Sequence, residues 1–167
     1  MHDTQHKTRV LAIDPGYERL GIAIIEKNAN EQKDLLLYSD CFNTSAQKSF
    51  QERLLCIGEE IERVIHTYTP HVLATEQLYF TNNQKTALKV AEVRGVISYL
   101  SQKHHLVLFE YGPSQIKQAV SGYGKSTKDQ VAKMVSHLIT IEKPITVDDE
   151  YDAIAIGLTC FASERFT

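Results

Sequence analysis

Four acidic residues far apart in the chain stand at predicted strand ends or at a predicted helix start, where they could do chemistry together. Asp14 lies in VLAIDPGYERLGIAII, Glu76 in HVLATEQLYF, and Asp149 and Asp152 in VDDEYDAIAIGL. Each borders or interrupts an apolar run, where burial of an unpaired charge is costly unless a cation or another partner compensates it. A shared divalent cation is the simplest compensation, and clustered carboxylates are what two-metal cleavage of a phosphodiester bond requires.

Each acid also has an ordinary structural explanation. An Asp before Pro-Gly is a common turn residue, which would account for Asp14. Glu76 has no Lys or Arg near it in the sequence, so a local salt bridge does not explain it. Asp149 and Asp152 are three positions apart and project from one side of a helix start. Acids at a helix N-terminus cap it favourably, but capping explains one or two acids and hardly Asp152.

The elements that must position these acids follow from the apolar pattern. Val- and Ile-rich runs predict strands at about residues 8–15, 20–27, 34–42, 72–77 and 106–111. Apolar residues at intervals of three to four predict helices at about 46–68, 83–101, from Pro113 onward and at 129–138, with a final helix capped by Asp149 or a neighbour. Strands in succession followed by alternating helices and strands predict a mixed sheet with helices on its faces.

The bulk composition fits one globular unit. The chain has 167 residues, 43% of them hydrophobic, and we expect residues 1–7 to form a disordered N-terminal tail and 8–167 a single domain. It has no apolar run of membrane-spanning length and no secretory signal, so we expect a cytoplasmic protein. The cysteines number 3 and are widely spaced, which predicts reduced thiols rather than disulfides or a CxxC metal site.

The charge is unevenly distributed. The formal net charge of -3 argues against a general nucleic-acid binder. Residues 82–133, however, contain eight Lys or Arg against three Asp or Glu, a net charge of +5, which leaves -8 for the remainder. A basic middle could face phosphates despite the acidic total, although a solvated surface without a ligand explains it equally well.

Taken together, the motifs resemble those of RuvC-type Holliday-junction resolvases. The resemblance covers about residues 8–163 and is carried by IDPGYERLG, ATEQLYF followed by ALKVAEVRG, FEYGPSQIKQAVSGYGKSTKDQVAKMV, and DxxDAIAIG, in the family's order and approximate spacing. It implies an α/β, RNase H-like fold with a five-stranded mixed sheet flanked by helices on both faces. It also implies an endonuclease that resolves four-way DNA junctions in recombination and repair by paired symmetric nicks.

The resemblance further implies that the four acids are metal ligands. Asp14, Glu76, Asp149 and Asp152 would hold two Mg2+ per active site, with Mn2+ as a substitute, because hard cations prefer carboxylate oxygen. Cleavage would leave 5'-phosphate and 3'-hydroxyl ends. Some family members have His where this chain has Asp149, and a one-residue shift of the helix start would bring Asp148 nearer the metals, so the role of Asp148 stays open.

The resemblance also carries residues for DNA binding. Tyr79 matches an aromatic position that stacks on bases, with Phe80 beside it. Lys117 and Lys128 match basic positions near the scissile phosphate. The remaining candidates are Lys125 in the GYGKSTK loop and Asn83 in the TNNQ segment. Ordinary core packing for Tyr79, and a solvated surface or loop for the others, are the alternatives.

Partners follow from the same resemblance. The helix containing Gly95 is similar to the segment through which these resolvases pair, so we expect a homodimer that presents two metal sites to a two-fold junction. A branch-migration motor is a further expected partner. The competing hypotheses are an RNase H-like ribonuclease and a non-catalytic junction-binding protein. The basic loop and Tyr79 argue against the first, and four clustered acids facing phosphates argue against the second. A phosphotransferase of related architecture would need more glycine-rich loops than 8 glycines allow.

Overall fold

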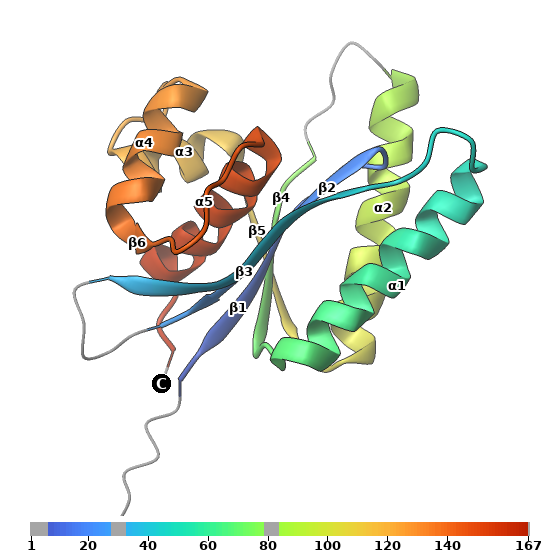
Figure 1. Cartoon of the computed structure of the whole chain (residues 1–167), viewed down its shortest axis with the longest axis horizontal. Helices are drawn as coiled ribbons and strands as arrows, with labels where there is room; N and C mark the ends of the chain where they lie inside the picture. Colours follow the sequence, from blue (N-terminus) through green and yellow to red (C-terminus); the bar gives the residue numbers. More distant parts are fainter. Residues whose placement is uncertain (1–6, 28–32, 79–83, 167) are drawn as a thin grey trace, which may run out of the picture.

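A six-stranded mixed sheet forms the centre of the computed structural model, which describes residues 7–27, 33–78 and 84–166. The strands run in the order β5-β4-β1-β2-β3-β6 across the sheet (Figure 1). Their bounds are β1 Arg9–Asp14, β2 Arg19–Glu26, β3 Asp34–Asn43, β4 Val72–Glu76, β5 Val107–Tyr111 and β6 Ile139–Thr140.

The strand directions follow the predicted mixed pattern. β1, β2 and β3 form an antiparallel meander, whereas β4 lies parallel to β1 and β5 parallel to β4. The five strands expected from the sequence are all present. The sixth, β6, consists of two residues that pair in parallel with the start of β3. A two-residue strand has no alternation of its own to read, because only its tertiary pairing defines it.

Five helices cover the two faces of the sheet. α1 (Phe50–Tyr68) and α2 (Gln84–Lys103) pack on one face, and α3 (Pro113–Ser121), α4 (Lys128–Leu138) and α5 (Asp148–Ser163) on the other (Figure 1). The alternation of β1 explains the two cores. Leu11 and Ile13 point to the α1 side, while Val10 and Ala12 point to the α5 side, and all four are fully buried. Burial on both faces explains why the strand reads as a continuous apolar run.

The helix ends refine the expected boundaries. α1 begins at Phe50 rather than near residue 46, since Ser49 and Glu52 form a capping box that fixes its start. The prediction that Asp149 or a neighbouring acid caps the last helix is wrong. The N-cap of α5 is Val147, without a side-chain cap, and Asp148, Asp149 and Glu150 occupy the first turn. In that position their negative charges interact favourably with the helix dipole, but their side chains do not cap the N-terminus of α5.

α5 lies unusually close to the middle of the sheet. At Gly157 an added Cβ would stand 2.6 Å from Cδ1 of Ile25 and 3.2 Å from Cβ of Ala12. A larger residue at this position would require Ile25 to change its rotamer and Ala12 to move by a few tenths of an ångström. The close contact fixes the height of α5 above β1 and β2, and therefore the position of its first turn at the sheet's edge.

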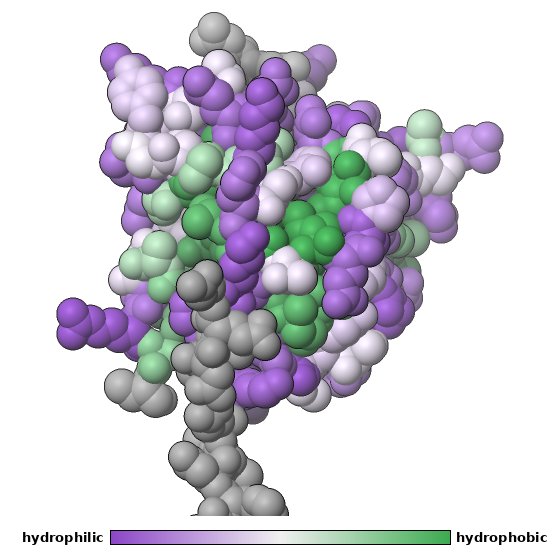
Figure 2. All heavy atoms as spheres, turned by 60° about the vertical axis from the view of Figure 1, so that its left-hand side comes forward, coloured by the Kyte–Doolittle hydropathy of each residue, from purple (hydrophilic) through white to green (hydrophobic). Residues whose placement is uncertain are grey.

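On the face of the molecule that Figure 2 shows, hydrophilic residues surround an apolar area. Within the described ranges, no helix combines the length and apolarity that a membrane crossing needs.

Residues 1–6 of the expected N-terminal tail lie outside the described residues, whereas Nζ of Lys7 forms an ion pair with Oε1 of Glu26 at 2.9 Å. The single-domain boundary at residue 8 stays a prediction.

Candidate active site

Two of the four acids end neighbouring parallel strands. Asp14 is the last residue of β1 and Glu76 the last of β4. The register places Ile13 opposite Thr75, and the buried Thr75 hydroxyl donates to the Ile13 carbonyl at 2.9 Å. Because both strands run in the same direction, their carboxyl ends meet at one edge of the sheet and bring the two carboxylates together.

The other two acids reach this edge from the first turns of α5. Gly21 of β2 pairs directly with Asp14 in the sheet. A Cβ on Gly21 would stand 2.2 Å from the carbonyl oxygen of Asp149 and 3.1 Å from Cβ of Asp14. The absence of a side chain at Gly21 therefore lets the start of α5 sit against the end of β1. Asp149 and Asp152 are thereby carried to Asp14 from the far end of the chain.

Three of the acids surround one cavity of about 350 Å³. Asp14, Glu76 and Asp152 line it together with the basic Lys117 of α3 and Lys128 of α4. Its remaining wall is mostly apolar and is made by Pro113, Ile116, Val131, Ala155 and Ile156. A concave site with convergent charged groups on an apolar wall is the arrangement expected of a binding or catalytic site.

Burial and the neighbouring carboxylates raise the pKa of Asp14 and of Glu76. Burial, followed by repulsion from Asp152, Glu76 and Asp149, raises the pKa of Asp14 to about 7. Burial and then repulsion from Asp152 also raise the pKa of Glu76, while Lys128 and Lys117 oppose the shift. Such a cluster is unfavourable as it stands, so a bound cation would relieve both the repulsion and the cost of burial.

Asp149 stands at the side of the cluster next to β2 and β3. Among the described residues its buried Oδ2 has no hydrogen-bond partner, but it forms an ion pair with Nη1 of Arg19 at 3.4 Å. Burial and the nearby Asp149 raise the pKa of the Cys41 thiol to about 11, which keeps it neutral. A buried carboxylate oxygen without a hydrogen bond could accept a cation, and oxygen-only ligands suit Mg2+.

The three predicted phosphate-binding lysines differ in position. Nζ of Lys128 lies 2.7 Å from Oδ2 of Asp152, and this hydrogen bond is the main cause of its raised pKa. Lys117 is half-buried in the cavity wall. Lys125 is exposed between α3 and α4 and does not line the cavity. Asp148, the first residue of α5, is exposed, and its charge acts on Lys128.

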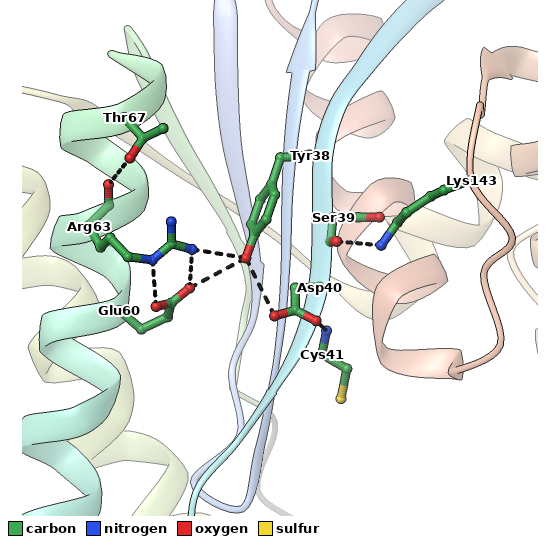
Figure 3. Close-up of polar contacts among 8 residues, drawn as sticks. All are labelled: Tyr38, Ser39, Asp40, Cys41, Glu60, Arg63, Thr67 and Lys143. Carbon is green, nitrogen blue, oxygen red and sulfur yellow. Dashed lines mark hydrogen bonds and ion pairs between the residues drawn. The ribbon is translucent and has the colours of Figure 1, made fainter.

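The contacts that hold the start of α5 could not be predicted from the sequence. Glu150, buried between Asp149 and the apolar part of α5, accepts hydrogen bonds from the Ser39 hydroxyl at 2.7 Å and from Lys143 at 2.6 Å. Lys143 also donates to the Ser39 carbonyl at 2.5 Å (Figure 3). A glutamate whose partners come from β3 and from the loop before α5 shows no periodic signal in the sequence.

Tyr38, the residue of β3 directly before Ser39, faces the other helical layer. The Tyr38 hydroxyl accepts from Nη2 of Arg63 at 3.1 Å and lies 3.4 Å from carboxylate oxygens of both Glu60 and Asp40 (Figure 3). Arg63 in turn holds Glu60 at 2.6 Å. Two successive residues of β3 thus link the strand to α1 on one side and to the start of α5 on the other.

Three predicted DNA contacts, Tyr79, Phe80 and Asn83, lie outside the described residues. The predicted pairing segment is visible. Gly95 is an exposed residue of α2 with open space where a Cβ would stand, and the same helix exposes Leu88 and Tyr99 by 65% and 64%. Large apolar side chains exposed on one helix are typical of an interaction surface.

Comparison with known proteins agrees with this geometry. Residues 10–160 match the family described as "Crossover junction endodeoxyribonuclease RuvC". A protein of that description from Petrotoga mobilis is 42% identical over 157 residues, covering 94% of this chain and 93% of the relative. A solved structure described as T. thermophilus RuvC in complex with Holliday junction substrate superimposes with a TM-score of 0.84 at 30% identity, covering 91% of this chain and 92% of the other. The yeast mitochondrial Holliday junction resolvase Ydc2, at 17% identity and a TM-score of 0.70, covering 93% of this chain and 78% of the other, shares the fold.

Proposed function

Because the chain belongs to the RuvC family of crossover junction endodeoxyribonucleases, whose members are metal-dependent, we propose that its clustered carboxylates form the metal centre with which it cleaves four-way DNA junctions. The proposed ligands are Asp14, Glu76, Asp149 and Asp152. The observation that carries the proposal is the convergence of acids from β1, β4 and α5 on one cavity, where burial and the neighbouring carboxylates raise the pKa of Asp14 and of Glu76. Protein folds do not keep such repulsion without a compensating cation or a function.

The chemistry assigns a role to each group. Bound Mg2+, a pair of ions per site with Mn2+ as substitute, would supply an activated water and stabilise the leaving 3' oxygen, so that 5'-phosphate and 3'-hydroxyl ends result. Asp14 would give up its proton when a cation arrives, because the cation reverses the cause of its raised pKa. Asp149, whose Oδ2 forms an ion pair with Arg19 but has no hydrogen bond among the described residues, would be a further ligand.

The lysines would bind the substrate's backbone. Lys117 and Lys128 line the cavity that holds the acids, so a phosphate entering it would meet both ammonium groups. Lys128, whose side chain is 68% exposed, can exchange Asp152 for a phosphate by rotating its flexible stem. Lys125 would contact DNA further from the cut. Tyr79, Phe80 and Asn83 remain proposed contacts from the sequence.

We further propose that the protein acts as a homodimer on the junction named in the description of its Thermus relative. The exposed Leu88 and Tyr99 of α2 support pairing through this helix. A two-fold dimer would present two acid clusters to the two equivalent strands of a junction, which explains paired symmetric nicks. A branch-migration motor as partner and a cytoplasmic location agree with this role and remain expectations.

The test is cleavage of a labelled mobile four-way junction, beside linear duplex and an RNA-DNA hybrid, in Mg2+ or in EDTA. We expect symmetric nicks in the junction alone, in Mg2+ alone, and none with Asp14→Asn. Lys133→Ala, a change of an exposed lysine on α4 that does not line the cavity, is the matched control and should cut normally. Cutting by Asp14→Asn at the wild-type rate would refute the metal centre, and cutting of the hybrid alone would refute the substrate.

A further inference from the structure

Away from the acid cluster, two histidines and a glutamate gather where α1 and α2 end. Glu62 and His66 lie on α1, and His104 directly follows the end of α2. One potential ligand atom from each lies within 4.8 Å of those of the other two. We propose that these three side chains form a second cation site, of the kind that binds Zn2+, which clamps the end of α1 to the end of α2.

Regular helical backbone holds the three residues near one another. Glu62 and His66 are four positions apart, so they share one face of α1. The backbone N–H of His104 continues the helical pattern by donating to the Leu100 carbonyl at 3.0 Å. The His66 and His104 rings meet edge to face with centroids 5.2 Å apart. The cluster therefore requires small side-chain rotations to close on an ion, with no movement of the helices.

The donor set selects the class of metal. Two imidazoles and one carboxylate suit borderline-soft divalent ions, whereas Mg2+ prefers all-oxygen sites such as the acid cluster. Ligands about 2.1 Å from a tetrahedral zinc lie roughly 3.4 Å from one another. The present separation of 2.8 Å between Nε2 of His104 and Oε1 of Glu62 would widen slightly as the ion replaces that hydrogen bond. A water would complete the coordination.

The competitor for the site is Lys103. Its Nζ lies 2.8 Å from the same Glu62 oxygen that His104 contacts. The lysine side chain is 46% exposed, so it can swing into solvent at little cost when a divalent ion arrives. His104, with a side chain 15% exposed, is held in the cluster. In the metal-free protein, the Lys103 ammonium therefore lies at the position proposed for the cation and can be displaced from it easily.

The site is distinct from the proposed nuclease centre and does not depend on it. His66 lies in the last turn of α1, which leads through Thr69 into the start of β4, whereas Glu76 ends that strand. The cluster also belongs to the α1 and α2 face, whereas Asp149 and Asp152 come from the opposite layer. A metal here would act on the stability of the α1–α2 pair rather than on cleavage.

The test is Zn2+ and Co2+ binding by the untagged full-length protein in excess Mg2+. His2 and His6 are changed to Gln in every sample, so that these N-terminal histidines add no background. Titration calorimetry should give one more Zn2+ equivalent in this protein than in His66→Gln/His104→Gln. Co2+ should give an intense visible absorption of tetrahedral coordination only when both histidines are present. Zn2+ should also raise the melting temperature by a few degrees, and the double variant should lose that rise.

The matched control is His137→Gln, at a histidine in the last turn of α4. It should keep the extra equivalent and the Co2+ absorption. Far-UV circular dichroism and junction cleavage without Zn2+ should be the same in all variants, which separates loss of the site from misfolding. If the double variant binds as many Zn2+ equivalents as the control, or if Co2+ gives no tetrahedral absorption in the unaltered cluster, the proposed site is wrong.

Discussion

The first turns of α5 carry two kinds of carboxylate within three residues of one another. Glu150 is buried and satisfied by Ser39 and Lys143. Asp149 and Asp152 instead lie near Asp14, whose pKa is raised by burial and then by repulsion from these acids and Glu76. The neighbouring acids thus lie on opposite sides of one helix, with opposite energetic consequences. Glu150 stabilises the position of the helix. Repulsion between the two aspartates and Asp14 lowers the stability of the folded protein until a bound cation or substrate offsets it.

The largest effect should come from Asp152→Asn. We expect junction cleavage to fall by roughly 10³-fold because a proposed metal ligand loses its charge. The free energy of unfolding should change by less than about 1 kcal/mol, since the exposed pair with Lys128 contributes little and repulsion with Asp14 disappears. Rates under single-turnover conditions and urea denaturation measure the two quantities.

The control on the same helix is Glu150→Gln. It should cleave within a few-fold of the wild type, because it keeps the shape of the side chain and one hydrogen-bond acceptor. If Glu150→Gln lost as much cleavage as Asp152→Asn, the division of the helix into a structural side and a chemical side would be wrong.

The second test uses the pH dependence of stability without metal. The pKa of Asp14 is about 7 in the folded protein and 3.8 for the free side chain, so the folded state binds its proton more tightly than the unfolded state. The stability that Asp14 contributes is therefore present at acid pH and lost as pH rises toward 7. Between pH 5 and pH 8 the loss should be about 3 kcal/mol.

Asp14→Asn supplies the reference for this measurement. In EDTA its unfolding free energy should fall less between pH 5 and pH 8 than that of the wild type, as followed by urea denaturation. Mg2+ should restore stability to the wild type at pH 8 and much less to Asp14→Asn. Parallel pH profiles for the two proteins in EDTA would show that Asp14 keeps an ordinary pKa.

Removing the carboxylate of Glu150, whose hydrogen bonds are satisfied, should have a smaller effect on the free energy of unfolding. Glu150→Ala leaves the buried Ser39 hydroxyl without its acceptor and Lys143 without its ion pair. Because the Lys143 side chain is 46% exposed and can reach water, we expect a loss of about 2 kcal/mol rather than the larger cost of a stranded buried charge. Glu142→Ala, at an exposed position one residue from Lys143, should be neutral in the same thermal melts.

The smallest effect should be that of Tyr38→Phe, on the other side of β3. The change removes the hydroxyl that accepts from Arg63 but keeps the ring stacked on Tyr68 at 5.3 Å. Arg63 still pairs with Glu60, so we expect a loss of about 1 kcal/mol and unchanged cleavage. A larger loss of cleavage than for Glu150→Ala would mean that α1 helps to position the acids.

The sequence alone allowed much of the fold and the acid cluster to be predicted, for identifiable reasons. β1 and β4 are buried on both faces, so each reads as an apolar run with its acid at the end. The start of α5 was harder, because three adjacent acids look alike in sequence and only the packing of Gly21 against Asp149 selects which ones face Asp14. The link from Ser39 to Glu150 spans 111 residues and left no local signal.

The docking of α5 at Gly21 also links the activity to the order of protein synthesis. Asp14 and Glu76 leave the ribosome early, but their partners on α5 follow only after all six strands have been made. A chain that stops before α5 lacks two of the four acids and the helix that fills the middle of one core. If the four acids form the proposed metal centre, a chain that stops before α5 would therefore be unable to cleave a junction, and the activity would arise only once α5 has been made.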